Sequence, residues 1–237
     1  MGSLPGVGGR GRGAVARCDT GVVKAESNAA DRVAAQLRGE LLSGLHHPGE
    51  RLREEQLSTR LRTGRYTVRA ALQALVASGL LDHRPNRGAI VPLLTRERVD
   101  ELYDHREVLE IGALRLAQRR GADLSAVAEA THALQNLPAD APWVDVILTH
   151  QRIHHELVLA AGNGKLLHAY TQCEEELHFV VSTVRPDFTA PRLAELHTTL
   201  LAEIQRGGRA AIHALERDLR VGRSAVLEAL HHQERVS

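Results

Sequence analysis

Two arginines spaced four residues apart are the first side chains in this sequence that could do chemistry with a partner. Arg65 and Arg69 follow the turn-forming pair Thr63-Gly64, and residues 68–76 carry apolar side chains at helical spacing. Side chains four apart lie on one helical face, so both guanidinium groups would project away from the apolar face. Guanidinium groups at the start of a helix can bind guanine or phosphate in a DNA major groove. A solvated amphipathic helix is the alternative that spacing alone leaves open.

The segments around these arginines predict a winged helix-turn-helix. Residues 57–61 form a short helical segment before the turn, and apolar residues from Val33 to Leu42 recur at helical spacing in a supporting helix. After Leu81, two short apolar segments flank the tip at residues 83–88, which predicts a β-hairpin wing. A basic, glycine-bearing wing can lie along a minor groove or a phosphate backbone.

Composition favours a mainly helical protein with a basic N-terminal part and an acidic C-terminal part. Aromatic residues make up only 3% of the 237 residues, whereas strands usually draw on aromatic and β-branched residues. Residues 29–95 contain ten Arg and six acidic residues, a net charge of +4. Residues 96–237 contain sixteen basic and twenty-one acidic residues, a net charge of −5. Only residues 29–95 are therefore expected to bind a polyanion such as DNA.

Cysteine use and hydropathy favour a reduced, cytoplasmic protein. Cys18 and Cys173 are the only cysteines, and they lack metal-type spacing. The sequence has no run of eighteen apolar residues and no apolar core of a signal peptide, so we expect no membrane partner. Residues 1–28 are rich in glycine and lack periodicity, which predicts a disordered arm. A vector remnant or a misplaced start is favoured over a native arm that touches phosphates.

Helical segments follow one another from Thr95 to about Leu230. Pro138, Pro142, the Gly162-Asn163-Gly164 run and the Gly207-Gly208 pair separate them into six helices. The expected fold class is mainly α, with an N-terminal winged helix-turn-helix followed by an all-α six-helix bundle. The expected domains are residues 29–94 for the winged helix-turn-helix and residues 95–232 for the helical bundle.

Four separated strings resemble the GntR family of bacterial transcription regulators. They are PGERL at residues 48–52, GRYTVRAAL at 64–72, SGLL at 78–81 and RPNRG at 84–88. The resemblance covers residues 29–92 and implies DNA contacts from Arg53, Arg65, Tyr66, Thr67, Arg69, Arg84, Asn86, Arg87 and Gly88. The chain departs from the family pattern at Gly64, Tyr66, Thr67 and Ala70, so its operator sequence is expected to differ. Glycine at residue 64 also offers no side-chain acceptor for a helix cap.

Residues 96–230 resemble the ligand-binding FCD domain of the fatty-acid-regulator branch of this family. The resemblance rests on Arg106 and Glu110, on HQRIHHELVLAAGN at residues 150–163, and on Leu196-His197 followed by Ile204 and Gly207. Many members of that branch hold a divalent metal with one Asp and three His. The resemblance therefore implies a buried metal site between the helices.

The family's ligand pattern falls on His150, His154, His197 and Asp218. His150 stands where the family usually has aspartate, and Asp218 stands where the family usually has histidine. Spacing four places the first two imidazoles on one helical face. Strict spacing from His197 falls on Leu219, and His155 and His213 are the alternatives for a ligand. Imidazole and carboxylate ligands suit zinc, nickel or manganese, and zinc is favoured.

The resemblance implies an effector that is a small organic acid. Such a carboxylate would bind at the metal, with Arg106 pairing from the side. The alternative for Arg106 is an intrahelical pair with Glu110, which would contribute only about 0.3 to 0.5 kcal/mol, and both roles are compatible.

The predicted function is a homodimeric repressor or activator that binds double-stranded operator DNA under effector control. One alternative is a metal-dependent hydrolase, which the sequence disfavours because it has no HExxH arrangement and no Ser or Cys nucleophile motif. The other is a metal-free helical interaction module attached to a DNA-binding domain.

Overall fold

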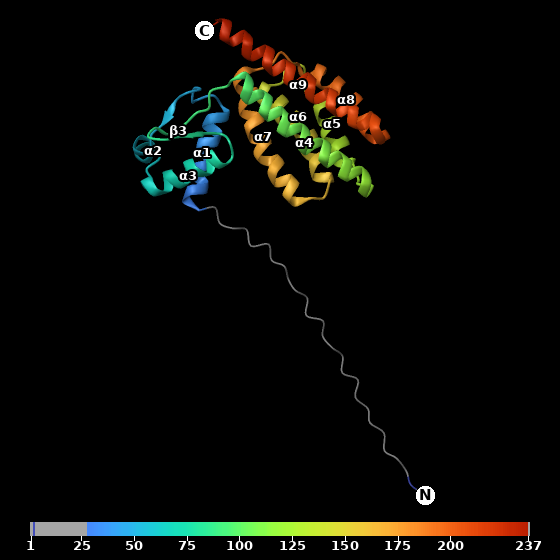
Figure 1. The fold of residues 1–237 in the computed structure, drawn as a ribbon, viewed down its shortest axis with the longest axis horizontal. Helices are drawn as coiled ribbons and strands as arrows, with labels where there is room; N and C mark the ends of the chain where they lie inside the picture. The colour runs from blue at the N-terminus through green and yellow to red at the C-terminus, as the bar shows by residue number, and fades with distance from the viewer. Residues whose placement is uncertain (1, 3–27, 237) are drawn as a thin grey trace.

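The computed structural model describes Gly2 and residues 28–236. A small mixed unit at the N-terminal side lies beside a larger bundle of helices (Figure 1). The arm expected at residues 1–28 lies outside the described residues, apart from Gly2 and Asn28. Asn28 caps the first helix in a reciprocal capping box with Asp31, which explains why the helix begins at Ala29.

The N-terminal unit is the expected winged helix-turn-helix with one additional short strand. Its elements are α1 (Ala29–Leu42), β1 (Arg51–Leu52), α2 (Glu54–Arg60), α3 (Arg65–Ala77), β2 (Asp82–Arg84) and β3 (Gly88–Ile90). The sheet has the order β1-β3-β2, and both pairings are antiparallel. The sequence analysis predicted the β2–β3 hairpin and missed β1, which pairs two residues with β3.

Turn residues in the N-terminal unit set where its elements begin. Gly64 is the N-cap of α3 and makes no side-chain capping hydrogen bond, as expected for glycine at this position. At the tip of the wing, Asn86 and Gly88 have φ angles of 64° and 73°, a region that asparagine and glycine tolerate best. Leu37, Val68 and Leu75 are fully buried in the shared core of the three helices.

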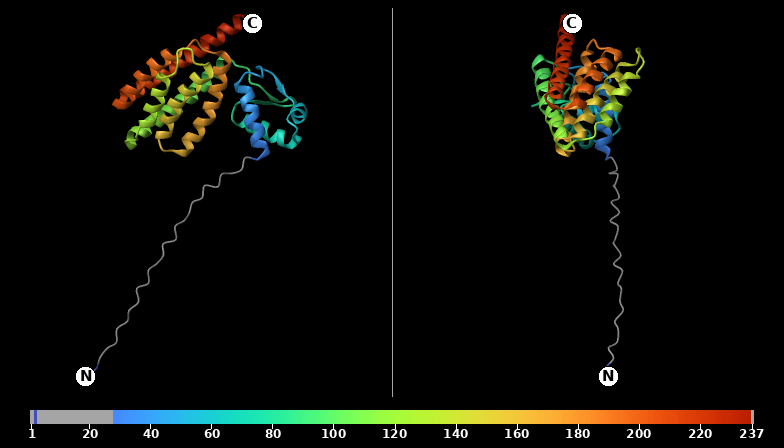
Figure 2. Two further views of the ribbon diagram at one scale, coloured as in Figure 1. Left: turned by 180° about the vertical axis from the view of Figure 1, so that it is seen from behind. Right: turned by 90° about the vertical axis from the view of Figure 1, so that its right-hand side faces the viewer.

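The C-terminal part consists of the six expected helices. They are α4 (Arg96–Arg120), α5 (Ser125–Gln135), α6 (Trp143–Ala160), α7 (Gly164–Val184), α8 (Ala190–Arg206) and α9 (Gly208–Val236). Thr95 and Asn163 cap α4 and α7 with their side-chain oxygens. Figure 2 shows the helices packed side by side, with α9 crossing the bundle from one end to the other. The mainly α fold class is confirmed, although α9 extends beyond the expected end at Leu230.

Helix α7 of the bundle packs against the winged helix. Phe179 on α7 is 1% exposed and belongs to the core of the N-terminal unit. Arg98 on α4 bonds to Asp82 on β2, to Glu176 on α7 and to the Gly79 carbonyl oxygen after α3. A further ion pair joins Arg38 on α1 to Glu175 on α7 at 3.3 Å. The winged helix is therefore fixed to the bundle by the apolar contact of Phe179, the ion-pair cluster of Arg98 and the Arg38–Glu175 pair. Within the described part of the chain, no helix is both long and apolar enough to cross a membrane.

Candidate functional site

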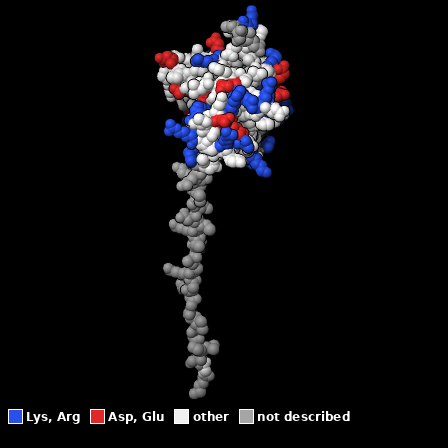
Figure 3. Space-filling view, turned by 90° about the vertical axis from the view of Figure 1, so that its left-hand side faces the viewer, with Lys and Arg blue, Asp and Glu red and all other residues white. Residues whose placement is uncertain are grey.

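The start of α3 presents the two arginines and the tyrosine that the sequence analysis selected. Arg65, Tyr66 and Arg69 are exposed, and Tyr66 is 85% exposed despite its large apolar ring. Thr67 is half-buried beside them. Arginine side chains gather on this side of the winged helix, with acidic side chains between them (Figure 3). The surface is thus basic and carries hydrogen-bond donors at a helix N-terminus.

Both arginines of α3 are paired with glutamates of α2. Arg69 donates from Nε and Nη2 to the two carboxylate oxygens of Glu54, at 2.9 and 2.7 Å. Arg65 donates from Nη2 to Glu55 at 2.8 Å. The hydrogen bonds from Arg69 lower the pKa of Glu54, so this pair is charged at neutral pH. A guanidinium whose one edge is fixed in this way can still offer its Nη1 hydrogens to a base or phosphate.

The wing residues lie across a groove from α3. Arg84, Asn86 and Arg87 are exposed, and Gly88 is half-buried at the start of β3. The groove has a volume of about 760 Å³, and the residues lining it include Arg53, Arg69, Gln73, His83 and Arg87. A groove lined by basic side chains between a helix and a wing could follow a phosphate backbone. Four of the predicted DNA-contacting residues, Arg53, Arg69, Arg87 and Gly88, therefore line one groove.

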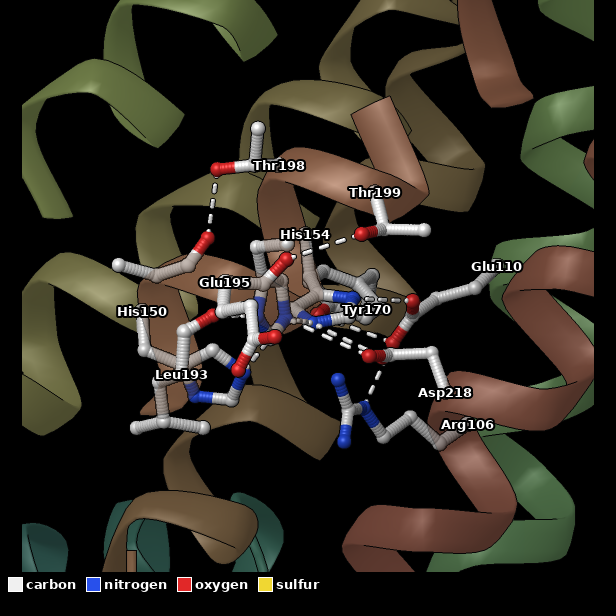
Figure 4. Close-up of polar contacts among 12 residues, drawn as sticks. Arg106, Glu110, His150, His154, Tyr170, Leu193, Glu195, Thr198, Thr199 and Asp218 are labelled. Carbon is white, nitrogen blue, oxygen red and sulfur yellow. Dashed lines mark hydrogen bonds and ion pairs between the residues drawn. The ribbon is translucent and has the colours of Figure 1, made fainter. Parts of the chain in front are cut away.

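A second cluster of functional side chains lies inside the helical bundle. His150 and His154 come from α6, His197 from α8 and Asp218 from α9 (Figure 4). The Nε2 atom of His197 is 3.0 Å from His150 Nε2 and 3.2 Å from His154 Nε2. Carboxylate oxygens of Asp218 lie 3.6 Å from the Nε2 atoms of His154 and His197. The structure therefore brings the four predicted ligand residues together.

Hydrogen bonds on the outer side of two imidazoles fix which nitrogen faces the centre. His154 donates from Nδ1 to Glu110 Oε2 at 2.7 Å, and His197 donates from Nδ1 to the Leu193 carbonyl oxygen at 2.8 Å. We assign the proton to Nδ1 in both because each partner is an acceptor. Burial lowers the pKa of His197, which keeps this ring neutral near pH 7. With Nδ1 of both rings engaged outside the cluster, the Nε2 atoms of His154 and His197 face each other at 3.2 Å.

The donor geometry fits a divalent metal. Donor atoms around a tetrahedral ion with bonds of about 2.0 to 2.1 Å lie roughly 3.3 Å apart, close to the separations found here. The ligand atoms of the three histidines all lie within 4.8 Å of one another. Burial and the neighbouring His197 and His154 lower the pKa of His150 well below its ordinary value, so its ring is neutral too. Three imidazoles and one carboxylate are a donor set suited to zinc, nickel or manganese.

A buried charged network supports this centre. Arg106 donates from Nε to Glu110 Oε1 at 2.6 Å, and Tyr170 donates its hydroxyl to the same oxygen at 3.3 Å. Burial alone would raise the pKa of Glu110, but Arg106 and His154 lower it to about 2. The Arg106–Glu110 pair is the one expected from their spacing, but its expected energy was wrong. Arg106 is 3% exposed and Glu110 is fully buried, so the energy of an exposed pair does not apply.

The alternative ligands lie elsewhere. His155 pairs with Glu174 at 2.9 Å, and exposed His213 pairs with Glu216 at 3.0 Å. The sequence analysis missed two outer contacts, that of Glu110 with His154 and that of Leu193 with His197. The second could have been found, because residues four apart on a helix are neighbours. The first joins residues 44 apart in the chain and left no local signal.

A small apolar cavity opens beside the histidines. Its volume is about 50 Å³, and Arg106, His150, His197 and Asp218 form its polar end. The other lining residues come mainly from α6, α7, α9 and the α7–α8 connection, and they include Trp143, Ile147, Leu177, Val181, Phe188 and Val226. Arg106, the residue predicted to meet an effector, therefore lies at the edge of a cavity.

Comparisons with known proteins place both parts of the chain. Residues 29–91 match the family described as "Bacterial regulatory proteins, gntR family", and residues 101–220 match the FCD domain. The Nta operon transcriptional regulator of Aminobacter aminovorans is 29% identical over 133 residues, which span 56% of this chain and 63% of that protein. The uncharacterized HTH-type transcriptional regulator YdhC of Bacillus subtilis (strain 168) is 26% identical over 183 residues, 74% of this chain and 80% of that protein.

Solved structures agree with the sequence matches. The crystal structure of a GntR transcriptional regulator from Rhodococcus sp. RHA1 is 28% identical, with a TM-score of 0.70 over 84% of this chain and 98% of that chain. E. coli McbR/YncC shares the fold at 20% identity, with a TM-score of 0.69 over 86% of this chain and 99% of that chain. The relatives are transcriptional regulators and not enzymes, so the hydrolase alternative is set aside. The chain belongs to the GntR family of bacterial regulatory proteins and carries an FCD domain.

Proposed function

We propose that this transcription regulator binds operator DNA through residues 29–94 and senses a small organic acid at a divalent metal within residues 95–232. The observation that carries the proposal is the convergence of His150, His154, His197 and Asp218, with two imidazoles oriented by outer acceptors. When bound, a metal such as zinc would supply a Lewis-acidic position for a carboxylate oxygen. Arg106 would pair with the same carboxylate from the side.

On the DNA side, we propose that a homodimer places two copies of α3 in successive major grooves. Arg65, Tyr66, Thr67 and Arg69 would read bases or hold phosphates. Arg53 and the wing residues Arg84, Asn86, Arg87 and Gly88 would contact the adjacent backbone or minor groove. A pseudo-palindromic operator is the matching target.

Helix α7 is the proposed route between the two functions. Leu177 and Val181 line the cavity beside the histidines, while Phe179 and Glu176 contact the winged helix. A ligand that shifts or rigidifies α7 would change the energy of one arrangement of the winged helix relative to another. Coupling of this kind typically amounts to about 1 to 3 kcal/mol.

The names of two relatives favour repression as the mode of action. One is the gluconate operon transcriptional repressor of Bacillus licheniformis, 35% identical over 79 residues that cover 32% of that protein. The other is the HTH-type transcriptional repressor GlaR of Escherichia coli (strain K12), 29% identical over 137 residues. We therefore propose that the chain is a repressor whose effector releases it from the operator.

Metal analysis combined with DNA binding tests the proposal. The purified full chain should contain about one metal ion per chain, and a His154→Ala/His197→Ala double variant should contain none. His155→Ala/His213→Ala is the matched control, because these histidines lie outside the cluster. Operator DNA would be obtained by sequencing the genomic fragments that the protein retains. Absence of stoichiometric metal, with operator binding unchanged by a chelator, would leave a metal-free helical module instead.

A further inference from the structure

The cavity beside the histidines has one polar end and otherwise apolar walls. Among the lining residues of the described chain, Arg106 and Asp218 carry charges at the polar end, beside His150 and His197. Two other lining residues have polar groups: Tyr103, whose ring lies 5.5 Å from the Arg106 guanidinium, and Trp143, whose indole nitrogen already donates to the Val181 carbonyl oxygen. The opposite walls are formed by aliphatic and aromatic side chains of Ile147, Val181 and Phe188, among others. A polar group of a ligand in that region would have no partner for its hydrogen bonds. Burying a polar group without a partner is unfavourable, so the walls select against it.

From this cavity we infer that the effector is a short aliphatic monocarboxylate, such as butyrate, rather than a di- or tricarboxylate or a sugar acid. The inference rests on the proposed function, because it assigns the carboxylate to the metal and to Arg106. It adds what lies beyond the carboxylate, which is an unsubstituted hydrocarbon chain.

The charges around the polar end match one carboxylate and not two. A divalent metal contributes +2, Arg106 contributes +1, and Asp218 and Glu110 contribute −1 each, while imidazole ligands are neutral. The sum is +1, which a single carboxylate neutralises. A second carboxylate would bring a buried negative charge to the apolar walls, where it has no cation to pair with.

The size of the cavity limits the length of the hydrocarbon chain. A volume of about 50 Å³ corresponds to roughly four water-sized positions. The space therefore suits a short hydrocarbon chain better than a long one. Phe188, in the α7–α8 connection, is half-buried and forms part of the wall, so its ring helps to set this length.

Calorimetric titration of the zinc-loaded full chain with matched acids tests the inference. Butyrate and succinate have the same number of carbons and differ in the second carboxylate. Butyrate should bind roughly tenfold tighter or more, and citrate and gluconate should bind no better than succinate. Neutral butyramide should bind more weakly than butyrate, because it lacks the charge that Arg106 and the metal attract.

A variant that enlarges the cavity provides a second measurement. Phe188→Ala should raise the affinity for hexanoate relative to butyrate by about tenfold, since the longer chain gains the space of the lost ring. Leu159→Ala, at an exposed apolar position of α6 outside the cavity, should leave that ratio unchanged. A ring with a merely structural role would weaken all chain lengths equally.

The outcomes separate this inference from the proposed function. Stoichiometric zinc together with succinate or citrate binding as tightly as butyrate would overturn the monocarboxylate assignment and leave the metal site standing. Stoichiometric zinc with no binding of butyrate would do the same. Absence of any stoichiometric divalent metal from the wild-type chain, together with failure to bind added zinc, nickel or manganese, would overturn both proposals.

Discussion

The charged groups of the winged helix and those of the helical bundle are arranged in opposite ways. Arg65 and Arg69 are exposed, and each pairs with one glutamate of α2 in contact with water. Arg106 and Glu110 are buried, and Glu110 pairs with both Arg106 and His154. Exposed pairs contribute little to stability, so their guanidinium groups are available for a partner. Buried charges depend on one another, because each would be uncompensated if its partner were removed.

This difference separates the effects of mutation. A change on the DNA-facing side of α3 should alter binding and leave the fold intact. A change in the buried network should alter the fold and the candidate metal site together. Helix α7 belongs to both environments, so changes at its contacts should alter the communication between them.

The largest expected effect is that of Glu110→Ala. The substitution leaves Arg106 buried without its partner and removes the acceptor that orients His154. We expect the free energy of unfolding to fall by about 3 to 5 kcal/mol, measured by urea denaturation. Zinc affinity should also fall by roughly 10- to 100-fold.

Glu107→Ala on the same helix is the matched control for Glu110→Ala, because Glu107 is exposed. Its free energy of unfolding should stay within about 0.5 kcal/mol of the wild-type value. If the two variants lost equal stability, the contrast between buried and exposed charges would be wrong for α4.

The second prediction concerns Arg69→Ala. Loss of a guanidinium that contacts a base should weaken operator binding by about 1 to 3 kcal/mol and relax sequence preference at one position of each half-site. The free energy of unfolding should change by less than about 1 kcal/mol, because the Glu54 pair is exposed to water. Fluorescence anisotropy with labelled operator and with scrambled DNA measures both effects.

Arg96→Ala removes another exposed arginine, at the start of α4, and serves as the control for Arg69→Ala. Arg69→Lys keeps the charge but loses the planar, bidentate geometry. Specific binding retained by Arg69→Ala would refute the assigned role of α3. Full rescue by the lysine variant would indicate a phosphate contact instead of base recognition.

The third prediction tests the junction at α7. Arg98→Met removes the ion pairs that join α4 to Asp82 and Glu176. We expect the effector-induced change in operator affinity to shrink by roughly 0.5 to 2 kcal/mol, while zinc content stays unchanged. Anisotropy titrations with and without saturating butyrate measure this coupling. Unchanged coupling in the variant would show that communication follows another contact.

Residues that are neighbours along one helix made much of this arrangement predictable from the sequence. Arg65 and Arg69 on one face, the glycine cap at Gly64 and the pairing of Arg106 with Glu110 all depend on local spacing. The six helices of the bundle were predictable because proline, glycine and asparagine separate segments with clear periodicity. Local chemistry was sufficient for these features.

Features that depend on distant contacts were not predictable from spacing. The burial of the Arg106–Glu110 pair follows from the packing of α6 and α7 on α4, which the local pattern does not encode. Strand β1 is only two residues long, too short for an alternating pattern to reveal it. Asp218 was placed beside the histidines by resemblance alone, because α9 reaches them from the end of the chain.

The smallest predicted effect comes from the Glu40–Arg60 pair, which is more buried than the ion pairs of α3 and more exposed than the Arg106–Glu110 pair. Glu40 on α1 accepts two hydrogen bonds from Arg60 at 2.8 and 2.7 Å, and another contact comes from His46. The bonds from Arg60 lower the pKa of Glu40 to about 2 despite the opposing effect of burial. A folded-state pKa below the unfolded value stabilises the fold above about pH 4.5, and this contribution is lost as pH falls towards 2.

Glu40→Gln should therefore reduce the free energy of unfolding at pH 7 by about 0.5 to 1 kcal/mol, since the half-exposed Arg60 weakens the pair through solvent screening. The gap between variant and wild type should narrow steadily from pH 4.5 to pH 2, because wild-type Glu40 becomes protonated over this range. Urea unfolding followed by circular dichroism at several pH values measures the gap. A gap that stayed constant with pH would mean that Glu40 acts through packing rather than charge, which would group it with the apolar core of the winged helix.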